Sequence, residues 1–447
     1  MVQKVGNSWL FAAKTVLFLF VLGGFFVGQI IFYEQTLFFY WGNYVVLLLY
    51  ATNIFLTSKI YHGFGFGSVD LKEIILSWII CLLVANSLQY LILSLSVMKL
   101  LPVAGFLAII GAQYVLVIPT AVLIDKAYYR VNPAHKAIII YGKEKKASEY
   151  LEIIEKHREK FKIKQVVSQE EPAEALLSYI KDSESVFFLD VAEKKRERLL
   201  EYCFLHNKRT YILPTFSGVL LNTAGISWIS HTPMFLPKSP KLDIGTRFIK
   251  RSMDIAISLL AIILFSWLMI LTWAAVFLYD RRSAIYRQTR ITKDGKQFTL
   301  YKFRSMNPDA EDDGVPRLTA KDDDRITPVG RFIRRTRIDE FPQLFNVLTG
   351  KMSIVGPRPE RPEIAKQYEE RYPNFAFRTK VKAGITGLAQ IYGKYNTAPD
   401  EKLFLDVMYI EKLSIWQDVI LMLQTLKVIF SFTSTEGVPK DSTTAMR

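Results

Sequence analysis

Residues 255–279 read IAISLLAIILFSWLMILTWAAVFLY, an apolar stretch long enough to cross a bilayer core. Because Lys and Arg gather on the cytoplasmic side of membranes, the charges beside this stretch indicate its orientation. Basic residues stand on both sides of it, namely Lys241, Arg247, Lys250 and Arg251 before it and Arg281, Arg282, Arg287 and Arg290 after it. A fifth transmembrane helix would strand one cluster outside, so we predict a re-entrant or in-plane helix. Ser266 and Trp267, near its middle, form the predicted bend.

Four other apolar stretches come earlier in the chain, each near the roughly 20 residues that span a bilayer. They cover residues 11–33, 37–57, 74–97 and 101–124, and they predict four transmembrane helices. The alternative for the first stretch is a cleavable signal peptide, but the stretch is too long for an h-region. Basic residues from Lys126 to Lys146 place the following segment, and with it the N-terminus, on the cytoplasmic side.

Residues 131–240 have the alternating pattern of a small α/β domain. Short apolar runs at 137–142, 163–167, 185–190 and 210–214 predict parallel strands joined by helices, a Rossmann-like arrangement. The turn after the first run, GKEKKASEY (142–150), has one glycine where a dinucleotide fingerprint needs three. A regulatory or assembly domain is therefore favoured over a nucleotide-binding one.

The overall composition limits the class of protein. The chain has 447 residues, of which half are apolar, and 57 Lys and Arg against 42 Asp and Glu give a net charge of +15. Apolar residues concentrated in long blocks exclude a purely soluble enzyme, and two cysteines exclude a disulfide scaffold. The positive charge requires an anionic partner: nucleic acid, anionic lipid or a phosphorylated substrate. Nucleic acid is the weakest of these, because the arginines cluster around carboxylates and next to membrane segments, without a recognition module.

Candidate chemistry lies in residues 286–430. The run QFTLYKF (297–303) predicts a strand, and Lys302 and Arg304 are expected on one face that could hold a phosphate. In RRTRIDEF (334–341), arginines precede Asp339 and Glu340. One carboxylate could attack a substrate while the other helps to bind a divalent metal, with the arginines keeping Asp339 ionised. A surface salt-bridge network is an equal alternative for this piece alone.

Three more motifs follow in order. In VGPRPERP (355–362), prolines restrict the backbone around Arg358, which suits bidentate recognition of phosphate. The glycine-rich VKAGITGLAQIYGKYN (381–396) could let backbone approach a ligand closely. Apolar spacing near 3.6 in residues 401–430 predicts amphipathic helices packed on the domain or on the membrane surface.

Together, these motifs resemble the catalytic domain of the bacterial sugar transferases, the monotopic polyprenyl-phosphate phosphoglycosyl transferases, over about residues 243–431. The preceding segments look like those of the long members that initiate exopolysaccharides and capsules. The resemblance implies transfer of a sugar-1-phosphate from a UDP-sugar to undecaprenyl phosphate, with release of UMP, at the cytoplasmic face of the bacterial cytoplasmic membrane. Asp339 would attack the sugar-bearing phosphorus, and Asp339 and Glu340 would bind Mg²⁺ or Mn²⁺. The implied phosphate-binding residues are Lys302, Arg304, Arg334, Arg358 and Lys394.

The resemblance also implies partners and shows departures. The lipid bilayer and downstream glycosyltransferases are expected partners, and the α/β domain would suit a homodimer contact. The family's Ser-Pro kink reads Ser266-Trp267, its Pro-Gly-Ile-Thr-Gly begins with Ala383, and Lys351 replaces an aspartate. Lys394 replaces a common arginine, and Asp406 matches a frequent aspartate whose role is structural or nucleotide-proximal. The sugar has no recognisable signature.

The expected fold is a membrane α-helical N-terminal bundle of four spans, a small Rossmann-like α/β domain, a re-entrant helix and an α-rich α+β monotopic catalytic domain. The expected boundaries are residues 1–130, 131–240, 241–282 and 283–432, with a polar tail at 433–447. The competing hypothesis is a membrane-bound sensor or scaffold whose C-terminal domain has lost activity. The intact Asp339-Glu340 pair argues against that loss.

Overall fold

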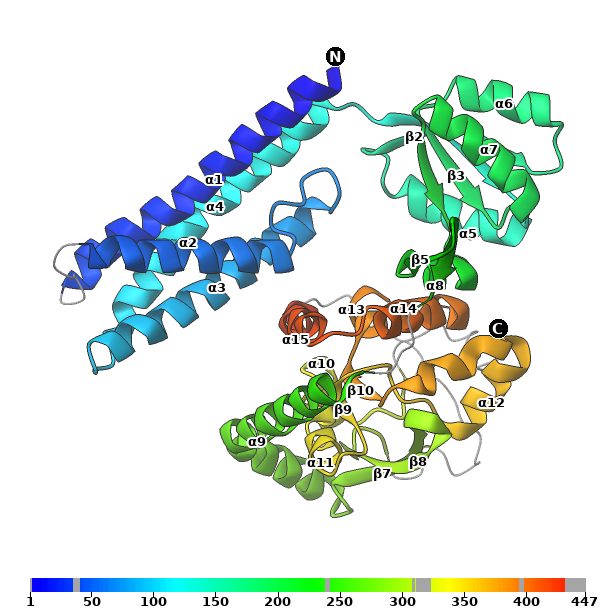
Figure 1. Ribbon diagram of the computed structural model, residues 1–447. Helices are drawn as coiled ribbons and strands as arrows, with labels where there is room; N and C mark the ends of the chain where they lie inside the picture. The colour runs from blue at the N-terminus through cyan, green and yellow to red at the C-terminus, as the bar shows by residue number, and fades with distance from the viewer. Residues whose placement is uncertain are drawn as a thin grey trace. The chain divides into compact units, whose positions relative to one another are not determined.

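The computed structural model describes residues 2–34, 41–237, 242–307, 310, 323–393 and 398–430. The chain divides into two compact units, Met1–Leu213 and Pro214–Arg447 (Figure 1). The predicted tail and Lys394 lie outside the described residues.

The first unit begins with four apolar helices. These are α1 (Val2–Phe32), α2 (Gly42–Ile60), α3 (Leu71–Ser96) and α4 (Val103–Val131). Within the described ranges, α1 (over Ser8–Phe32), α3 and α4 are long and apolar enough to cross a membrane. The 19-residue α2 is not among such helices, because residues such as Asn43, Asn53 and Lys59 reduce its apolar character. Helices are present at all four predicted positions, and three of them are long and apolar enough to cross a membrane. The start of the second predicted stretch, at 37–40, falls outside the described residues.

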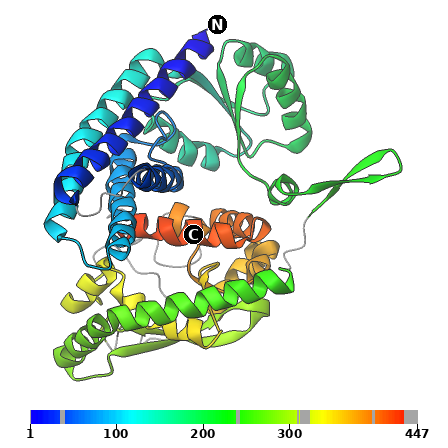
Figure 2. The same ribbon diagram turned by 60° about the vertical axis from the view of Figure 1, so that its left-hand side comes forward.

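A buried polar network joins these helices. Helices α1 and α4 lie side by side (Figure 2). Gln113 of α4 donates to the hydroxyl of Tyr50 at 2.9 Å and to the carbonyl oxygen of Val21 at 3.0 Å. Its Oε1 accepts from the side-chain amide of Asn86 at 2.7 Å. One fully buried glutamine therefore contacts all three other helices.

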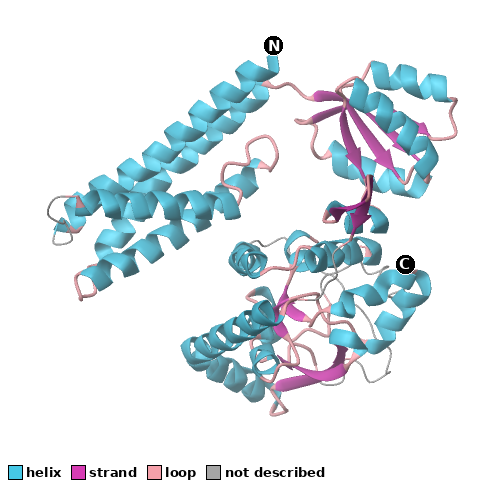
Figure 3. Cartoon of the chain, viewed as in Figure 1, coloured by secondary structure: helices cyan, strands magenta, loops and turns pink. Residues whose placement is uncertain are grey.

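The predicted parallel sheet follows the helices and is drawn in magenta in Figure 3. Its strands are ordered β2-β1-β3-β4 and are all parallel. The strands are β1 (His135–Tyr141), β2 (Phe161–Ser168), β3 (Ser185–Leu189) and β4 (Arg209–Ile212), connected by α5 (Glu144–Glu155), α6 (Ala173–Lys181) and α7 (Glu193–Leu205). The lone glycine after β1 has a packing role, since a Cβ at Gly142 would lie 2.0 Å from the carbonyl oxygen of Asp190. The regulatory or assembly role of this domain stays a prediction.

The second unit is a mixed α and β domain with short elements. In the part of this unit that the structure describes, the strands form three two-stranded sheets, β5/β6 and β7/β8 antiparallel and β9/β10 parallel. The strands are β5 (Gly225–Ile229), β6 (Thr232–Leu236), β7 (Ile285–Ile291), β8 (Gln297–Phe303), β9 (Ser353–Val355) and β10 (Gly384–Thr386). The helices are α8 (Phe216–Asn222), α9 (Ile244–Asp280), η2 (Lys293–Gly295), α10 (Pro328–Arg335), η3 (Ile338–Glu340), α11 (Gln343–Leu348), α12 (Pro362–Arg371), η4 (Pro373–Lys380), α13 (Leu388–Tyr392), α14 (Pro399–Glu411) and α15 (Ile415–Phe430).

The unit boundary differs from the expected domain boundary near residue 240. Val219 of α8 is buried in one apolar cluster with Tyr368 and Phe375. In addition, Thr223 donates a hydrogen bond to Glu411 at 2.9 Å. Residues from Pro214 onward therefore pack with the C-terminal unit, because the apolar side of α8 is covered there.

The apolar stretch around residues 255–279 lies in α9, whose helix continues through Ser266 and Trp267. Toward its start, the Arg251 guanidinium donates to the carbonyl oxygens of Val347 and Leu348, at 2.6 and 2.7 Å. Toward its end, Val276 packs in an apolar cluster of the same domain. Between them, large apolar side chains are exposed, among them Leu260, Ile263, Leu264, Trp267, Ile270 and Leu271. This helix also meets the length and composition of a membrane-crossing segment.

Candidate active site

The paired carboxylates Asp339 and Glu340 lie in η3, a short turn of helix after α10. The chain enters this turn through Arg337, which adopts a left-handed backbone with φ of 60°. Both carboxylate side chains are buried, with exposed fractions of 8 and 9% for the two residues. A buried pair of acids needs compensating charges or hydrogen bonds, so the surrounding groups determine what the pair can do.

Helix α10 is fixed against the end of β8 by sequence features at its start. Thr327 caps the helix, and its Oγ1 accepts from the backbone N–H of Gly330 at 2.9 Å. A Cβ at Gly330 would lie 1.9 Å from the carbonyl oxygen of Ser305, so this close approach requires glycine. The approach places the turn that follows α10 next to Lys302 of β8.

Three cations surround Glu340. Its Oε1 accepts from Lys302 Nζ at 3.0 Å and from Arg358 Nη2 at 3.0 Å, while Arg337 Nη1 lies 4.0 Å away. Lys302 and Arg358 come from different elements, a strand and a loop after β9. Glu340 therefore gathers positive charge beside Asp339.

The pKa values of the two acids in this cluster are shifted in opposite directions. Burial raises the pKa of Asp339, and only part of that effect is offset by the positive charges of Lys302, Arg334 and Arg337. Burial also opposes ionisation of Glu340, but Lys302, Arg358 and Arg337 outweigh it and hold its pKa well below the usual range. Glu340 is thus a firmly ionised anchor, and Asp339 is the buried carboxylate whose ionisation depends on its neighbours.

The two glycine-containing motifs meet in the β9/β10 sheet. The backbone N–H of Gly356 donates to Thr386 at 2.8 Å, and that of Gly384 donates to Pro357 at 2.9 Å. A Cβ at Gly384 would lie 2.1 Å from the backbone nitrogen of Gly356, so a side chain at this position would push the two strands apart. The glycines therefore allow backbone packing that supports the Arg358 loop.

Of the predicted phosphate-binding residues, Lys302 and Arg358 contact Glu340, and the charge of Arg334 acts on Asp339. Arg304 lies elsewhere: its guanidinium pairs with Asp280 and its Nε donates to Ser283 at 2.7 Å. The strand ends at Phe303, so the strand alternation does not extend to Arg304. Asp406 is also not at the acid pair. It is 1% exposed and pairs with Arg378 at 2.8 Å.

Sequence reasoning did not single out four further residues that the structure links to the site. Arg337 touches Glu340, while Arg290, Glu360 and Arg378 contact the Arg358 loop or its neighbours. Arg337 stood within the arginine cluster before Asp339, and it could have been named from that position. Glu360 stands in the same motif as Arg358 and could have been named from that position too, whereas Arg290 and Arg378 come from separate segments that no local pattern connects to it.

The acid pair could hold a divalent metal only together with ligands from the substrate. Among the described residues, no group of three or more acidic, His or Cys side chains could hold a metal ion. Mg²⁺ often takes just one or two carboxylates together with substrate phosphates, so Asp339 and Glu340 are a sufficient protein contribution. Glu340 is already paired with Lys302 and Arg358, which makes Asp339 the more available ligand.

The sequence matches a family model described as bacterial sugar transferase over residues 245–432, which includes the whole acid cluster. The C-terminal domain belongs to the bacterial sugar transferase family. This transferase domain comprises α9 and all later described elements, so the Asp339-Glu340 site lies in it.

Three relatives show how this domain is used elsewhere. An undecaprenyl-phosphate galactose phosphotransferase of Salmonella typhimurium is 37% identical over 254 residues, 53% of this chain and 52% of that protein. A UDP-N-acetylgalactosamine-undecaprenyl-phosphate N-acetylgalactosaminephosphotransferase of Aeromonas hydrophila is 36% identical, covering 53% and 55%. A UDP-glucose:undecaprenyl-phosphate glucose-1-phosphate transferase of Klebsiella pneumoniae is 40% identical, covering 48% and 45%. The chain spans about half the length of the curated relatives it matches.

Proposed function

We propose that this protein transfers a sugar-1-phosphate from a UDP-sugar to undecaprenyl phosphate, releasing UMP and initiating exopolysaccharide or capsule assembly. The observation that carries the proposal is the buried Asp339 beside Glu340, within a cluster of cations that can neutralise two phosphate groups. The names of the relatives support the substrate classes, since all three include undecaprenyl phosphate and two include a UDP-sugar.

In the first step, an Asp339 oxygen attacks the phosphorus that carries the sugar. The bond from that phosphorus to the bridging oxygen of the diphosphate breaks, and UMP leaves with the electron pair. Lys302 and Arg358 bind phosphate oxygens, which reduces the repulsion between the carboxylate and an anionic substrate. A bound Mg²⁺ or Mn²⁺ would supply further neutralisation of the diphosphate charge.

In the second step, an oxygen of undecaprenyl phosphate attacks the same phosphorus and Asp339 leaves as a free carboxylate. Arg334, whose charge acts on Asp339, would help hold the incoming lipid phosphate. The exposed apolar face of α9 supports entry of a lipid substrate beside the site. The product is an undecaprenyl-diphosphate sugar, which glycosyltransferases acting on lipid-linked sugars would extend.

We place α9 in the membrane as a re-entrant helix. A straight helix from Arg251 to Asp280 would be about 44 Å long at 1.5 Å per residue. Yet Arg251 binds Val347, and the adjacent Asn346 is hydrogen-bonded to Tyr301 at 3.1 Å. Arg304, which pairs with Asp280, comes only three residues after Tyr301, about 10 Å along a strand. The short distance between these two anchors supports a bent helix with both ends at the cytoplasmic face.

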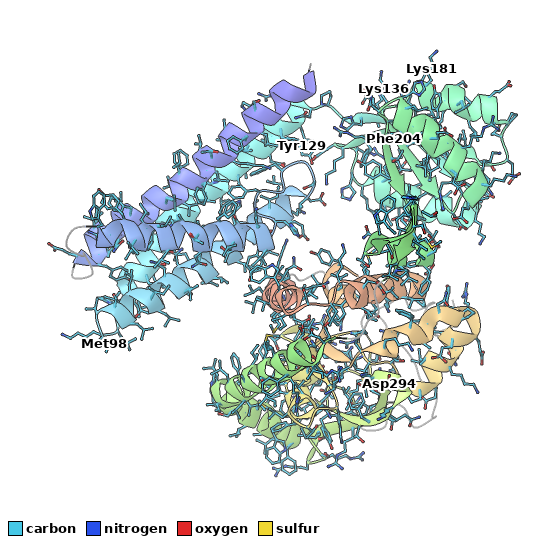
Figure 4. The ribbon with its side chains drawn as sticks, viewed as in Figure 1. Met98, Tyr129, Lys136, Lys181, Phe204 and Asp294 are labelled. Atoms are coloured by element: carbon cyan, nitrogen blue, oxygen red, sulfur yellow. The ribbon has the colours of Figure 1, made fainter. Side chains whose placement is uncertain are left out.

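The function is tested with the purified full chain, undecaprenyl phosphate, Mg²⁺ and a panel of UDP-sugars, scored by UMP release. We expect one UDP-sugar to be used preferentially, which identifies the sugar. We expect Asp339→Asn to lower the rate by about a thousandfold or more, because the nucleophile is lost. Asp294→Asn is the matched control, since Asp294 is exposed in the β7–β8 turn (Figure 4). A parental rate in Asp339→Asn would contradict the nucleophile assignment, and absence of UMP release with every sugar would contradict the function.

The orientation is tested with single cysteines in a variant that lacks the buried Cys81 and Cys203. We expect Arg247→Cys and Arg282→Cys to react with a membrane-impermeant maleimide only after the membrane is opened. Met98→Cys is the control for the outer side, because Met98 is 88% exposed in the α3–α4 turn (Figure 4). Labelling of either arginine position in intact cells would restore the five-span alternative. A homodimer through the α/β domain stays a prediction, which the mass of the detergent-solubilised protein would check.

A further inference from the structure

Arg378 is a buried cation that is separate from the acid pair but connected to it through the backbone. It lies in η4 and is 5% exposed. Its Nη1 donates to Glu360 at 3.2 Å, and its Nη2 lies 2.8 Å from an Asp406 oxygen. The same Nη2 donates to the carbonyl oxygen of Arg358 at 2.9 Å. One guanidinium therefore holds the buried carboxylate of Asp406, the partly buried carboxylate of Glu360 and one carbonyl of the loop that carries Arg358.

The next two carbonyls of this loop are also held. Arg290 Nη1 donates to the carbonyl oxygen of Pro359 at 3.0 Å. The backbone N–H of Ile291 donates to the carbonyl oxygen of Glu360 at 3.0 Å. Three consecutive carbonyls thus have fixed donors from β7 and η4, and the loop backbone has little freedom to move.

The other side of the loop faces the acid pair. The side chain of Arg358 is 43% exposed, and its Nη2 donates to Glu340 at 3.0 Å. Pro357 and Pro359 flank it and fix the backbone dihedrals on both sides. The direction in which Arg358 leaves the backbone is therefore set by the contacts of its own carbonyl and of its neighbours.

We propose that Arg378, held by Asp406 and Glu360, is a positioning residue that orients Arg358 toward the phosphates of the substrate. This inference rests on the proposed function. The planar guanidinium of arginine suits this positioning role, because its N–H groups can bind two carboxylates and a carbonyl in one fixed geometry. A lysine ammonium offers only a single point charge. Burying three charged groups is not the least costly way to pack a loop, which favours a role in geometry over one in stability.

The alternative is an ion cluster that only stabilises the domain. The two roles predict different behaviour when Arg358 is removed. A positioning residue acts through Arg358, so its loss matters only while Arg358 is present. A stabilising residue lowers activity by the same factor in both backgrounds, since the two effects are independent.

The experiment measures UMP release by the full chain for Arg378→Lys, Arg358→Ala and the double variant. We expect Arg378→Lys to lower kcat/KM by about tenfold or more, and to raise KM for the UDP-sugar, because a misdirected Arg358 binds the diphosphate less well. In the Arg358→Ala background, we expect the same change to alter kcat/KM by less than about twofold. Arg371→Lys, at an exposed position at the end of α12, is the matched control and should leave kcat/KM unchanged.

The KM of Arg378→Lys and the activity of a second variant distinguish partial unfolding of the protein from mispositioning of Arg358. Unfolding of a fraction of the protein lowers kcat and leaves KM unchanged. Asp406→Asn keeps the side-chain shape and leaves Arg378 paired with Glu360, so we expect a smaller loss of kcat/KM that also vanishes in the Arg358→Ala background. Equal losses in both backgrounds, or parental kcat/KM in Arg378→Lys, would overturn the positioning role while leaving the proposed function intact. A parent chain without UMP release would overturn both.

Discussion

Each of the two units contains a buried polar cluster, and the two clusters differ in charge. In the N-terminal helices, Gln113 and Asn86 satisfy each other through neutral hydrogen bonds. In the transferase domain, the ionised Glu340 is shared by Lys302 and Arg358, with more arginines nearby. A neutral network is complete without a ligand and stabilises helix packing, whereas excess positive charge beside a buried acid is compensated by an incoming anion. The difference teaches that burial of polar groups marks a binding site only when their charges are left unbalanced.

The largest effect that would sharpen this contrast is expected for Lys302→Met. Removing this cation, which we propose binds a substrate phosphate, should lower kcat/KM by about a hundredfold. Burial raises the pKa of Asp339, and the positive charge of Lys302 lowers it more than any other neighbouring charge does. The pKa of Asp339 should therefore rise further without Lys302. The acid limb of the kcat/KM profile should then move to higher pH, because the nucleophile role proposed for Asp339 requires an ionised carboxylate. Lys296→Met, at an exposed position of the same hairpin, is the control, and an unmoved acid limb would contradict the assignment.

Glu340→Gln should shift the same limb in the opposite direction. The negative charge of Glu340 raises the pKa of Asp339, so its removal should lower that pKa and move the acid limb to lower pH. We also expect a tenfold to hundredfold loss of kcat/KM, because Lys302 and Arg358 lose their shared anchor. The pH dependence of kcat/KM measures both the shift of the acid limb and the loss of activity. Exposed Glu369→Gln is the matched control, and a shift in the same direction as Lys302→Met would refute the coupling.

Breaking the neutral network around Gln113 should lower the stability of the helices and leave the rate of UMP release unchanged. Gln113→Leu removes the partners of Tyr50 and Asn86, and we expect a cost of about 1 kcal/mol in the stability of the helices. UMP release per folded molecule should stay near the parental value. Thermal unfolding in detergent and the activity of the folded fraction check the two parts. The 73% exposed Val115, changed to Leu, serves as control, and a tenfold loss of activity in Gln113→Leu would break the comparison.

The smallest effect is expected for Arg304→Lys. Arg304 is paired with Asp280, away from the acid pair, so its change should lower the unfolding temperature slightly and alter kcat/KM by less than about threefold. Arg358→Lys should cost more, because that guanidinium faces Glu340. If the two variants lost equal activity, the phosphate role that the sequence suggested for Arg304 would be supported after all.

Much of the architecture could be predicted because it depends on local patterns. Apolar runs of sufficient length predicted the N-terminal helices, and the spaced apolar runs predicted the four strands that form the parallel sheet. The adjacent Asp339 and Glu340 were recognisable because arginines and a proline surround them in the chain. Lys302 and Arg358 were also predicted, each from its own motif, and both contact Glu340.

Less could be predicted where an arrangement depends on a partner from a distant segment. The unit boundary at Pro214 depends on α8, whose Val219 is buried with Tyr368 and Phe375 from a later part of the chain. Asp406, for which a structural role was one of two alternatives, pairs with Arg378, and no local pattern predicted that partner. No periodicity reports such contacts, since they arise from tertiary packing.

The sequence by itself determined the apolar segments, the sheet, the acid pair and the cations that could serve it, because periodicity, length and adjacency are local properties. Only the tertiary structure decided which cations reach Glu340 and which do not. Arg304 and Arg358 are alike in charge and both stand in basic motifs, yet one lies beside Asp280 and the other beside Glu340. The physical reason is that a strand ending at Phe303 and a loop held at three carbonyls send these side chains in different directions.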